Sequence, residues 1–226
     1  MRKLALVFGG SRGIGAACVE ALKEEFDVAF TSVSGTAGHR ADIQKPEDVR
    51  SAFDNAEKQY GRKVDCVVVN AGIGVPPGPV AQFDTANFRM LVEVNVVGAF
   101  NVLREAGQRV ADGGSIIAIT TSMVRQAIPG FGPYAGTKAA VECMVRSMAK
   151  EIAPRKVRVN AVAPGPVDTD LFRAGKTEEA KQRSAGLSPF GRIGKPEEVA
   201  AVVGFLASDK ASWVHGQIVQ PNGGMV

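Results

Sequence analysis

The chain has 226 residues, of which 45% are hydrophobic and 22% charged, and its formal net charge is +4. This balance predicts one globular domain with a full core, spanning residues 1–226. Its longest apolar stretches, such as Val199–Ala207, fall well short of the ~18 residues of a membrane-spanning helix, so no membrane partner is expected. The basic residues form no block of like charge, which argues against a nucleic-acid partner.

The cysteines Cys18, Cys66 and Cys143 are odd in number and have neither CxxC nor metal-ligand spacing. This pattern argues against a disulfide framework or a metal site and favours the reducing cytoplasm. A basic pair before LALVF imitates a signal peptide, but the apolar run stops at Gly9. That run is shorter than the ~7 to 15 residues that export requires, so we expect a cytoplasmic protein.

Short runs rich in valine and isoleucine alternate with longer helical patterns, which is typical of βαβ units. The predicted strands are Leu4–Phe8, Val28–Ser32, Val64–Asn70, Ser115–Thr120, Val157–Ala163 and Gln217–Gln220. The predicted helices are Gly13–Glu24, Pro46–Tyr60, Thr85–Val110, Gly132–Ile152 and Pro196–Ala207. Pro46 and Pro196 precede acidic pairs, as expected at helix starts. The fold class is therefore α/β, a single Rossmann-type doubly wound parallel sheet of about seven strands with helices on both faces.

The least regular stretch is Pro164–Lys195, which has glycines and prolines at both ends and a short helical pattern inside. We interpret it as a mobile substrate lid over about residues 165–195, not as a domain boundary. It contains both apolar and basic side chains, so it does not name the substrate.

Four glycines, Gly9, Gly10, Gly13 and Gly15, lie between the first strand and the first helix. Small residues let the backbone turn tightly and let a pyrophosphate approach the free N–H groups of the helix. The alternative is a tight turn without a ligand.

A dinucleotide-binding fold usually has a carboxylate at the end of its second strand to bind the 2′-hydroxyl of NAD. Here Thr31, Ser32, Val33 and Ser34 occupy that place, and Arg12 in the glycine loop can pair with a 2′-phosphate. The sequence therefore favours NADP(H) over NAD(H), the alternative being that Arg12 is a solvated loop residue.

Tyr134 and Lys138 are four residues apart and so lie on one face of a helix. A tyrosine of pKa ~10 is a poor acid–base catalyst at neutral pH, and a nearby positive charge lowers that pKa. The pair predicts proton transfer, although YxxxK also occurs by chance on surface helices.

Together these motifs resemble the short-chain dehydrogenase/reductase family over the whole chain. The segments that carry the resemblance are FGGSRGIG at 8–15, ADI at 41–43, VNAG at 69–72, EVNVVGAF at 93–100, YAGTK at 134–138, RVNAVAPGPVDTD at 158–170 and the closing HGQIVQPNGG. The chain looks most similar to the NADPH-dependent aldehyde reductase-like branch and to reductases of 3-oxoacyl thioesters.

The resemblance implies a role for each matching residue. The pyrophosphate and adenosine phosphate would be bound by Gly9, Ser11, Arg12, Gly13, Ile14 and Gly15. The adenosine side would be formed by Ser32, Asp42 and Ile43. The cofactor cleft and the nicotinamide site would be formed by Asn70, Ala71, Gly72, Pro164, Gly165, Val167 and Thr169. Tyr134 would donate a proton to a carbonyl as the nicotinamide supplies hydride, with Lys138 on the ribose. Asn95 would bind a water linking Lys138 to solvent, or would instead bond its neighbours' backbone.

The substrate-binding hydroxyl of the family lies ~13 residues before the tyrosine and two places after the last apolar residue of its strand. Both counts lead to Thr121, whereas residue type selects Ser122. Thr121 is favoured, because its hydroxyl can donate the same hydrogen bond. Thr120 points to the opposite face of the strand and is expected to bond the core.

Several features depart from the family pattern. Phe8 replaces the usual threonine, Val69 replaces the first asparagine of NNAG, and Asn222 stands where an aspartate is common. The largest departure is the shortened connection after the second strand, Val33–Arg40, where a helix is missing. On this connection His39 and Arg40 either reach the 2′-phosphate or form a solvated pair.

The leading interpretation is a cytoplasmic NADPH-dependent carbonyl reductase acting on a small-molecule aldehyde, ketone or 3-oxoacyl thioester. The alternative is a nucleotide-binding regulatory protein of the same fold with little or no turnover, which would not need Asn95, Tyr134 and Lys138 together. By resemblance, the helices Thr85–Val110 and Gly132–Ile152 would pair with their copies in a dimer or tetramer.

Overall fold

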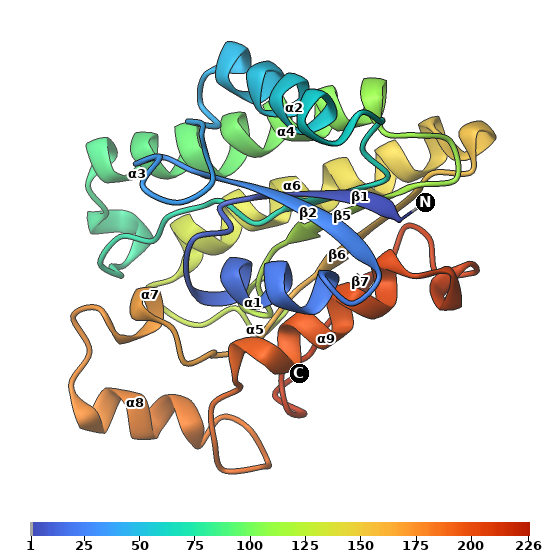
Figure 1. The fold of residues 1–226 in the computed structure, drawn as a ribbon. Coiled ribbons are helices and arrows are strands. Elements are labelled where there is room, and N and C mark those ends of the chain that lie inside the picture. The colour runs from blue at the N-terminus through green and yellow to red at the C-terminus, as the bar shows by residue number, and fades with distance from the viewer. Residues whose placement is uncertain (1) are drawn as a thin grey trace.

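The computed structural model describes residues 2–226 and contains a seven-stranded parallel sheet with the order β3-β2-β1-β4-β5-β6-β7 (Figure 1). The strands are β1 Lys3–Phe8, β2 Phe26–Ser32, β3 His39–Arg40, β4 Cys66–Val69, β5 Ser115–Ile119, β6 Arg158–Val162 and β7 Ile218–Val219. From β1 the strand order runs outward in both directions, so the sheet is doubly wound. The predicted fold class is confirmed.

Helices cover both faces of the sheet, with α2, α4 and α6 on one side and α1 and α9 on the other (Figure 1). The helices are α1 Gly13–Leu22, α2 Pro46–Tyr60, α3 Thr85–Val92, α4 Ala99–Arg109, α5 Met123–Gln126, α6 Gly132–Glu151, α7 Asp170–Arg173, α8 Glu178–Ala185 and α9 Pro196–Ala207. Across residues 2–226 no helix combines the length and the apolarity needed to cross a membrane.

Alternate residues of β1 face the two helical layers. Leu4, Leu6 and Phe8 pack toward α2, α4 and α6, whereas Ala5 and Val7 pack toward α1 and α9. A strand buried on both faces reads as a continuous apolar run, which is why KLALVF carries no polar alternation. The Phe8 ring lies 5.9 Å from that of Phe53 on α2, so the residue that replaces the family's threonine fills the core.

The predicted starts and ends of α2 and α9 match the structure at every terminal residue. In both helices a proline occupies the first turn, followed by acidic residues that interact favourably with the helix dipole. α2 stops at Gly61, which adopts a left-handed conformation with φ +67.

The helix predicted over Thr85–Val110 is interrupted, and this prediction is wrong in its continuity. A π-helix at Glu93–Gly98 separates α3 from α4, so Asn95 lies in the irregular segment. Insertion of one extra residue into a turn leaves the apolar pattern nearly unchanged, and periodicity therefore does not reveal it.

The connection from β2 to β3 contains no helix, as the sequence predicted. Residues 33–38 form a turn that the Ser32 hydroxyl closes, by donating to the Ala37 carbonyl at 2.7 Å and accepting from the Gly35 amide at 3.1 Å. β3 then pairs in parallel with the last two residues of β2, Thr31 with His39 and Ser32 with Arg40. Because β3 is this short, the chain doubles back over a small distance and needs no crossover helix.

Candidate active site

The loops after β1, β4, β5 and β6 lie together at the carboxyl edge of the sheet. Backbone bonds join them in pairs: the Ala71 amide donates to the Phe8 carbonyl at 2.8 Å, and the Ser122 amide to the Pro164 carbonyl at 2.9 Å. Ligands of open α/β sheets bind outside the carboxyl ends of the strands. The candidate site is therefore assembled from segments that are far apart in the sequence.

The N-terminus of α1 is suited to an anion. Arg12 precedes α1 without capping it, and the first turn has no acidic residue. The helices α3, α7 and α8, by contrast, are capped by the side chains of Asp84, Thr169 and Thr177. The first N–H groups of α1 have no intrahelical acceptor, so they and the helix dipole fit a pyrophosphate.

Two glycines permit this loop to form. Gly9 has φ +80, and a Cβ there would lie 2.8 Å from the Ala71 Cα. A Cβ on Gly15 would lie 2.0 Å from the Gly9 carbonyl oxygen. Asn70 also donates its side-chain amide to that oxygen at 2.8 Å, so Asn70 holds the glycine loop against the end of β4.

The loop after β6 closes over the glycine loop from the other side. A Cβ on Gly13 would lie 3.3 Å from the Thr169 methyl group, so these two residues border one cleft. Val167 is buried, and Thr169 caps α7 at the start of the predicted lid. The lid itself contains α7 and α8, which the sequence suggested only as a short helical pattern.

Lys138 lies beneath this edge, on the first part of α6. Its side chain is only 6% exposed, and Nζ donates to the Ile119 carbonyl at the end of β5, at 3.0 Å. Burial disfavours the ammonium form and lowers the pKa of Lys138 to about 8. The amine therefore loses its proton more readily than an ordinary lysine does.

Tyr134 lies one turn before Lys138 and remains partly exposed. Burial raises the pKa of the Tyr134 phenol to about 12. This direction is opposite to the one expected from the lysine charge, and its cause is desolvation of the phenolate. At neutral pH Tyr134 is thus a protonated phenol, the form of a hydrogen-bond donor and general acid.

The Asn95 side chain holds the loop that follows β4. Oδ1 accepts from the Ile73 amide at 2.9 Å, and Nδ2 donates to the Ile73 carbonyl at 3.0 Å and to the Thr137 hydroxyl at 3.3 Å. A Cβ on Gly72 would lie 3.0 Å from Asn95 Oδ1 and 3.2 Å from Lys138 Nζ. Asn95, Gly72 and Lys138 therefore meet, although the Asn95 amide is bound to backbone.

The three hydroxyls after β5 have different partners. Thr120 donates to Glu142 Oε1 at 3.0 Å in the core, as predicted. Ser122 donates to the Ala163 carbonyl at 2.7 Å and accepts from Asn222 Nδ2 at 3.3 Å. Thr121 only accepts, from the Met123 amide at 3.3 Å, so within residues 2–226 its proton has no acceptor.

The sequence analysis noted Asn222 only as a departure from the family pattern and missed its contact with Ser122. Asn222 Oδ1 also accepts from the amides of Gly224 and Met225, at 3.0 and 3.1 Å. No local pattern signals this contact, because its two sides are 100 residues apart.

The adenosine-side residues lie around the ends of β2 and β3. The Ser32 hydroxyl is bound within the turn, and Asp42 Oδ1 accepts from the Gln44 amide at 3.0 Å. The Ile43 side chain is buried against Gly98, so it faces the core and not the cleft. A contact of Ile43 with adenine would therefore have to come from its main chain.

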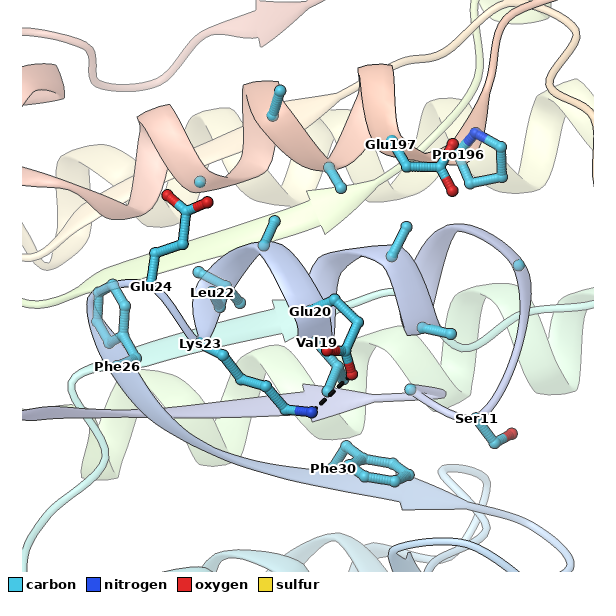
Figure 2. Close-up of a pocket in the computed structure, with 18 of the residues that line it drawn as sticks. Ser11, Val19, Glu20, Leu22, Lys23, Glu24, Phe26, Phe30, Pro196 and Glu197 are labelled. Carbon is cyan, nitrogen blue, oxygen red and sulfur yellow. Dashed lines mark hydrogen bonds and ion pairs between the residues drawn. The ribbon is translucent and has the colours of Figure 1, made fainter.

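A groove of about 1290 Å³ runs along α1 and α9 beside the site, and Figure 2 shows its walls. Its lining includes Gly10, Ser11, Phe30 and Ala37, together with small residues of both helices. Tyr134 does not line it. The groove meets the candidate site at the glycine loop and at Thr169. The polar groups described above, and not this groove, therefore mark where the chemistry takes place.

Comparisons with known proteins agree with this geometry. A family model described as enoyl-(acyl carrier protein) reductase matches residues 9–226. An Arabidopsis thaliana NADPH-dependent aldehyde reductase-like protein, named chloroplastic, is 38% identical over 254 residues, covering 99% of this chain and 94% of the relative. The versicolorin reductase stcU of Emericella nidulans is 35% identical over 98% of this chain and 95% of its own length.

Solved structures show the same architecture. A variant of a Serratia marcescens short-chain dehydrogenase/reductase matches with a TM-score of 0.88 and 33% identity, over 99% of this chain and 97% of that one. A Burkholderia cenocepacia short-chain dehydrogenase in complex with NADP matches with a TM-score of 0.90 and 28% identity, over 99% and 97%. With its doubly wound sheet, its glycine loop and its tyrosine and lysine on one helix, this chain belongs to the short-chain dehydrogenase/reductase family of oxidoreductases.

Proposed function

We propose that this protein reduces a carbonyl group of a small molecule to an alcohol, using NADPH and Tyr134 as general acid. The substrate is an aldehyde, a ketone or a 3-oxoacyl thioester. The observation that carries the proposal is the assembly at one sheet edge of an uncapped helix N-terminus, a protonated phenol and a buried lysine. A binding module would need only the first of these.

The cofactor, when bound, supplies hydride to the carbonyl carbon. Tyr134 donates its proton to the carbonyl oxygen as negative charge develops there, and Lys138 beneath it holds the ribose and favours loss of that proton. The glycine loop binds the pyrophosphate at α1. The remaining cofactor contacts are assigned to Ser11, Ile14, Asn70, Ala71, Gly72, Pro164, Gly165, Val167, Thr169 and the main chain of Ile43.

Thr121 is the proposed substrate-binding hydroxyl. The Ser122 proton is directed at Ala163, and its oxygen already accepts from Asn222. Moving that hydroxyl to a substrate would leave a buried carbonyl without a donor, which costs ~1 to 3 kcal/mol. The Thr121 hydroxyl donates to no acceptor within residues 2–226, so it can donate to the carbonyl oxygen beside Tyr134 without breaking a bond.

NADP(H) is preferred over NAD(H) in this proposal. The end of β2 has no carboxylate to repel a 2′-phosphate, and the Arg12 guanidinium makes no ion pair within residues 2–226. The name of the Arabidopsis relative and the NADP complex of the Burkholderia protein support this preference.

Asn95 is proposed to act through the π-helix that contains it. Its side chain fixes the loop at Ile73, so a water that relays protons to Lys138 would bind main-chain atoms of the same segment. Irregular π segments occur frequently at functional sites because they leave backbone groups without their usual partners.

Consumption of NADPH with a panel of aldehydes, ketones and 3-oxoacyl thioesters tests the function. The wild type should turn over at least one class, and Tyr134→Phe should bind NADPH normally with turnover almost abolished. Tight NADPH binding without turnover on any class would instead support the second candidate, a nucleotide-binding regulatory protein. The Tyr134, Lys138 and Asn95 arrangement favours the enzyme, since a regulator needs no proton relay.

We further propose that one domain of residues 1–226 carries both cofactor and substrate sites, and that the protein self-associates in the cytoplasm. Phe88 and Met90 on α3 and Phe100 on α4 are between 43% and 51% exposed. Large apolar side chains on neighbouring helices support pairing of this surface with a second copy, as a dimer or within a tetramer.

A further inference from the structure

The short turn between β2 and β3 presents polar groups where a crossover helix is missing. Residues 33–38 are all exposed. The hydroxyls of Ser34 and Thr36 lie 2.8 Å apart on this turn, with Gly35 between them. Gly35 has φ +69, and its amide is held by Ser32, so the tip of the turn has a defined shape.

Strand β3 sends its two side chains in different directions. His39 Nε2 lies 3.2 Å from Gln59 Oε1 on α2, so His39 belongs to the three-helix side of the sheet. Arg40 alternates to the other side, where its chain runs along the tip of the turn. A Cβ on Gly35 would lie 2.9, 3.4 and 3.6 Å from Cβ, Cγ and Cδ of Arg40. His39 and Arg40, whose role the sequence left open, therefore lie on opposite faces of β3.

The Arg40 side chain runs along Gly35, the residue between Ser34 and Thr36, and ends in a free cation. It is exposed and makes no ion pair or hydrogen bond within residues 2–226, unlike Arg109, which contacts Asp54 and Glu57 on α2. A guanidinium with neighbouring hydroxyl donors matches the oxygens of a phosphate group.

The turn and the glycine loop both pack against Phe30 of β2. A Cβ on Gly10 would lie 2.6 Å from the Phe30 Cβ, and a Cβ on Gly38 would lie 2.7 Å from the Phe30 ring. Figure 2 shows Phe30 below the part of α1 that holds Val19 and Glu20, with Ser11 in the loop before this helix. The Gly10 amide also donates to the Thr31 carbonyl at 3.0 Å.

The order of the strands sets the distance between the segments that carry Arg40 and Arg12. β3 lies one strand from β2 and two from β1, and adjacent strands are ~4.8 Å apart. Arg40 on β3 and Arg12 in the loop after β1 therefore lie on either side of the end of β2, with their strands two spacings apart. The end of β2 between them is Thr31 and Ser32 and has no carboxylate.

We propose that Arg40, with the hydroxyls of Ser34 and Thr36, binds the 2′-phosphate of the cofactor and sets the preference for NADP(H). This inference rests on the proposed function and assigns its specificity to a residue of β3. The short turn brings this cation to the end of β2 without the missing helix. Arg12 would contact the same phosphate from the glycine loop.

Calorimetric titration with 2′,5′-ADP and with 5′-AMP tests the inference without any turnover. Wild type should bind 2′,5′-ADP more tightly than 5′-AMP. Arg40→Ala should weaken 2′,5′-ADP binding by about 10- to 100-fold, the usual effect of losing hydrogen bonds to a charged group. Its affinity for 5′-AMP should stay within about twofold. Arg40→Lys should recover part of the loss, since it restores charge but not the planar fork.

His39→Ala is the matched control, because it changes the neighbouring residue on the other face of β3. It should leave both affinities unchanged. If wild type prefers 2′,5′-ADP and Arg40→Ala keeps that preference, the assignment to Arg40 is wrong while the NADP(H) proposal stands. If wild type binds both ligands equally, the NADP(H) preference itself fails, and this inference fails with it.

Discussion

Asn222 Nδ2 donates to Ser122 Oγ at 3.3 Å, which ties the C-terminal segment to the residue after Thr121. Ser122 in turn donates to Ala163, and the Gly165 amide donates to the Pro221 carbonyl at 3.2 Å. The C-terminal segment around Asn222 therefore holds both the loop with Thr121, on the proposed substrate side, and the loop with Gly165, on the proposed nicotinamide side. Ser122 thus holds the loop in position, whereas its neighbour Thr121 is the residue proposed to contact the substrate.

Replacing the two hydroxyls separately should show this division. Thr121→Ala should lower kcat/KM by about 10- to 100-fold with little change in stability, because it removes a donor to the developing oxyanion. Ser122→Ala should lower the free energy of unfolding by ~1 to 3 kcal/mol, because the buried Ala163 carbonyl loses its donor. Steady-state kinetics and urea denaturation measure the two effects. A larger kinetic loss in Ser122→Ala than in Thr121→Ala would show that Ser122 contacts the substrate.

Asn222→Asp tests the support itself, and the family commonly has aspartate here. The Asp variant keeps the acceptor for Gly224 and Met225 but places a second acceptor against Ser122, whose proton is directed at Ala163. We expect a loss of ~1 to 2 kcal/mol in the free energy of unfolding at pH 7. Protonation of the new carboxyl restores a donor, so the deficit against wild type should shrink as pH falls toward 4. Equal deficits at pH 7 and pH 4 would argue against this contact.

Lys138→Met should stabilise the protein while abolishing turnover. The ordinary pKa of 10.5 falls to about 8 in the fold, so keeping this lysine charged at pH 7 costs on the order of 3 kcal/mol, before the lost bond to Ile119 is subtracted. Between pH 8 and 10.5 the unfolded chain binds more protons than the folded one, so wild-type stability rises with pH. The advantage of Lys138→Met should therefore be largest near pH 7 and shrink by pH 10.

Denaturation of both proteins at pH 7 and pH 10 measures this effect. Lys150→Met, on an exposed position of α6, is the control and should show no such pH dependence. A constant difference between wild type and Lys138→Met across this range would contradict a depressed pKa of the lysine.

The fold could be predicted from the sequence because its signals are local. Apolar runs mark the buried strands, and a proline followed by acidic residues fixed the starts of α2 and α9. The π-helix around Asn95 was not predictable, because one extra residue per turn barely alters the apolar pattern. The absence of a helix before β3 was predictable, because too few residues were available to form one.

The site was predictable only where its residues share one element. Tyr134 and Lys138 lie on α6, so their spacing in the sequence fixes their placement. The contact of Asn222 with Ser122 depends on how distant segments pack, and no spacing encodes it. Burial raises the pKa of Tyr134, and the sequence could not reveal this effect because the extent of burial is a tertiary property.

Phe8→Thr introduces the residue that the family usually has and should destabilise this particular chain. Phe8 is fully buried, and its ring packs against Phe53 on α2. The substitution removes the buried ring and leaves a cavity, which costs ~3 to 5 kcal/mol in comparable Phe→Ala changes. Threonine additionally buries a hydroxyl without an assured partner. Because Phe8 points away from the cleft, the affinity for 5′-AMP should change by less than about threefold in the protein that remains folded. Val33→Thr, on the exposed turn, is the control and should leave the urea midpoint unchanged; a similarly unchanged midpoint in Phe8→Thr would show that the core at β1 adapts to the smaller residue.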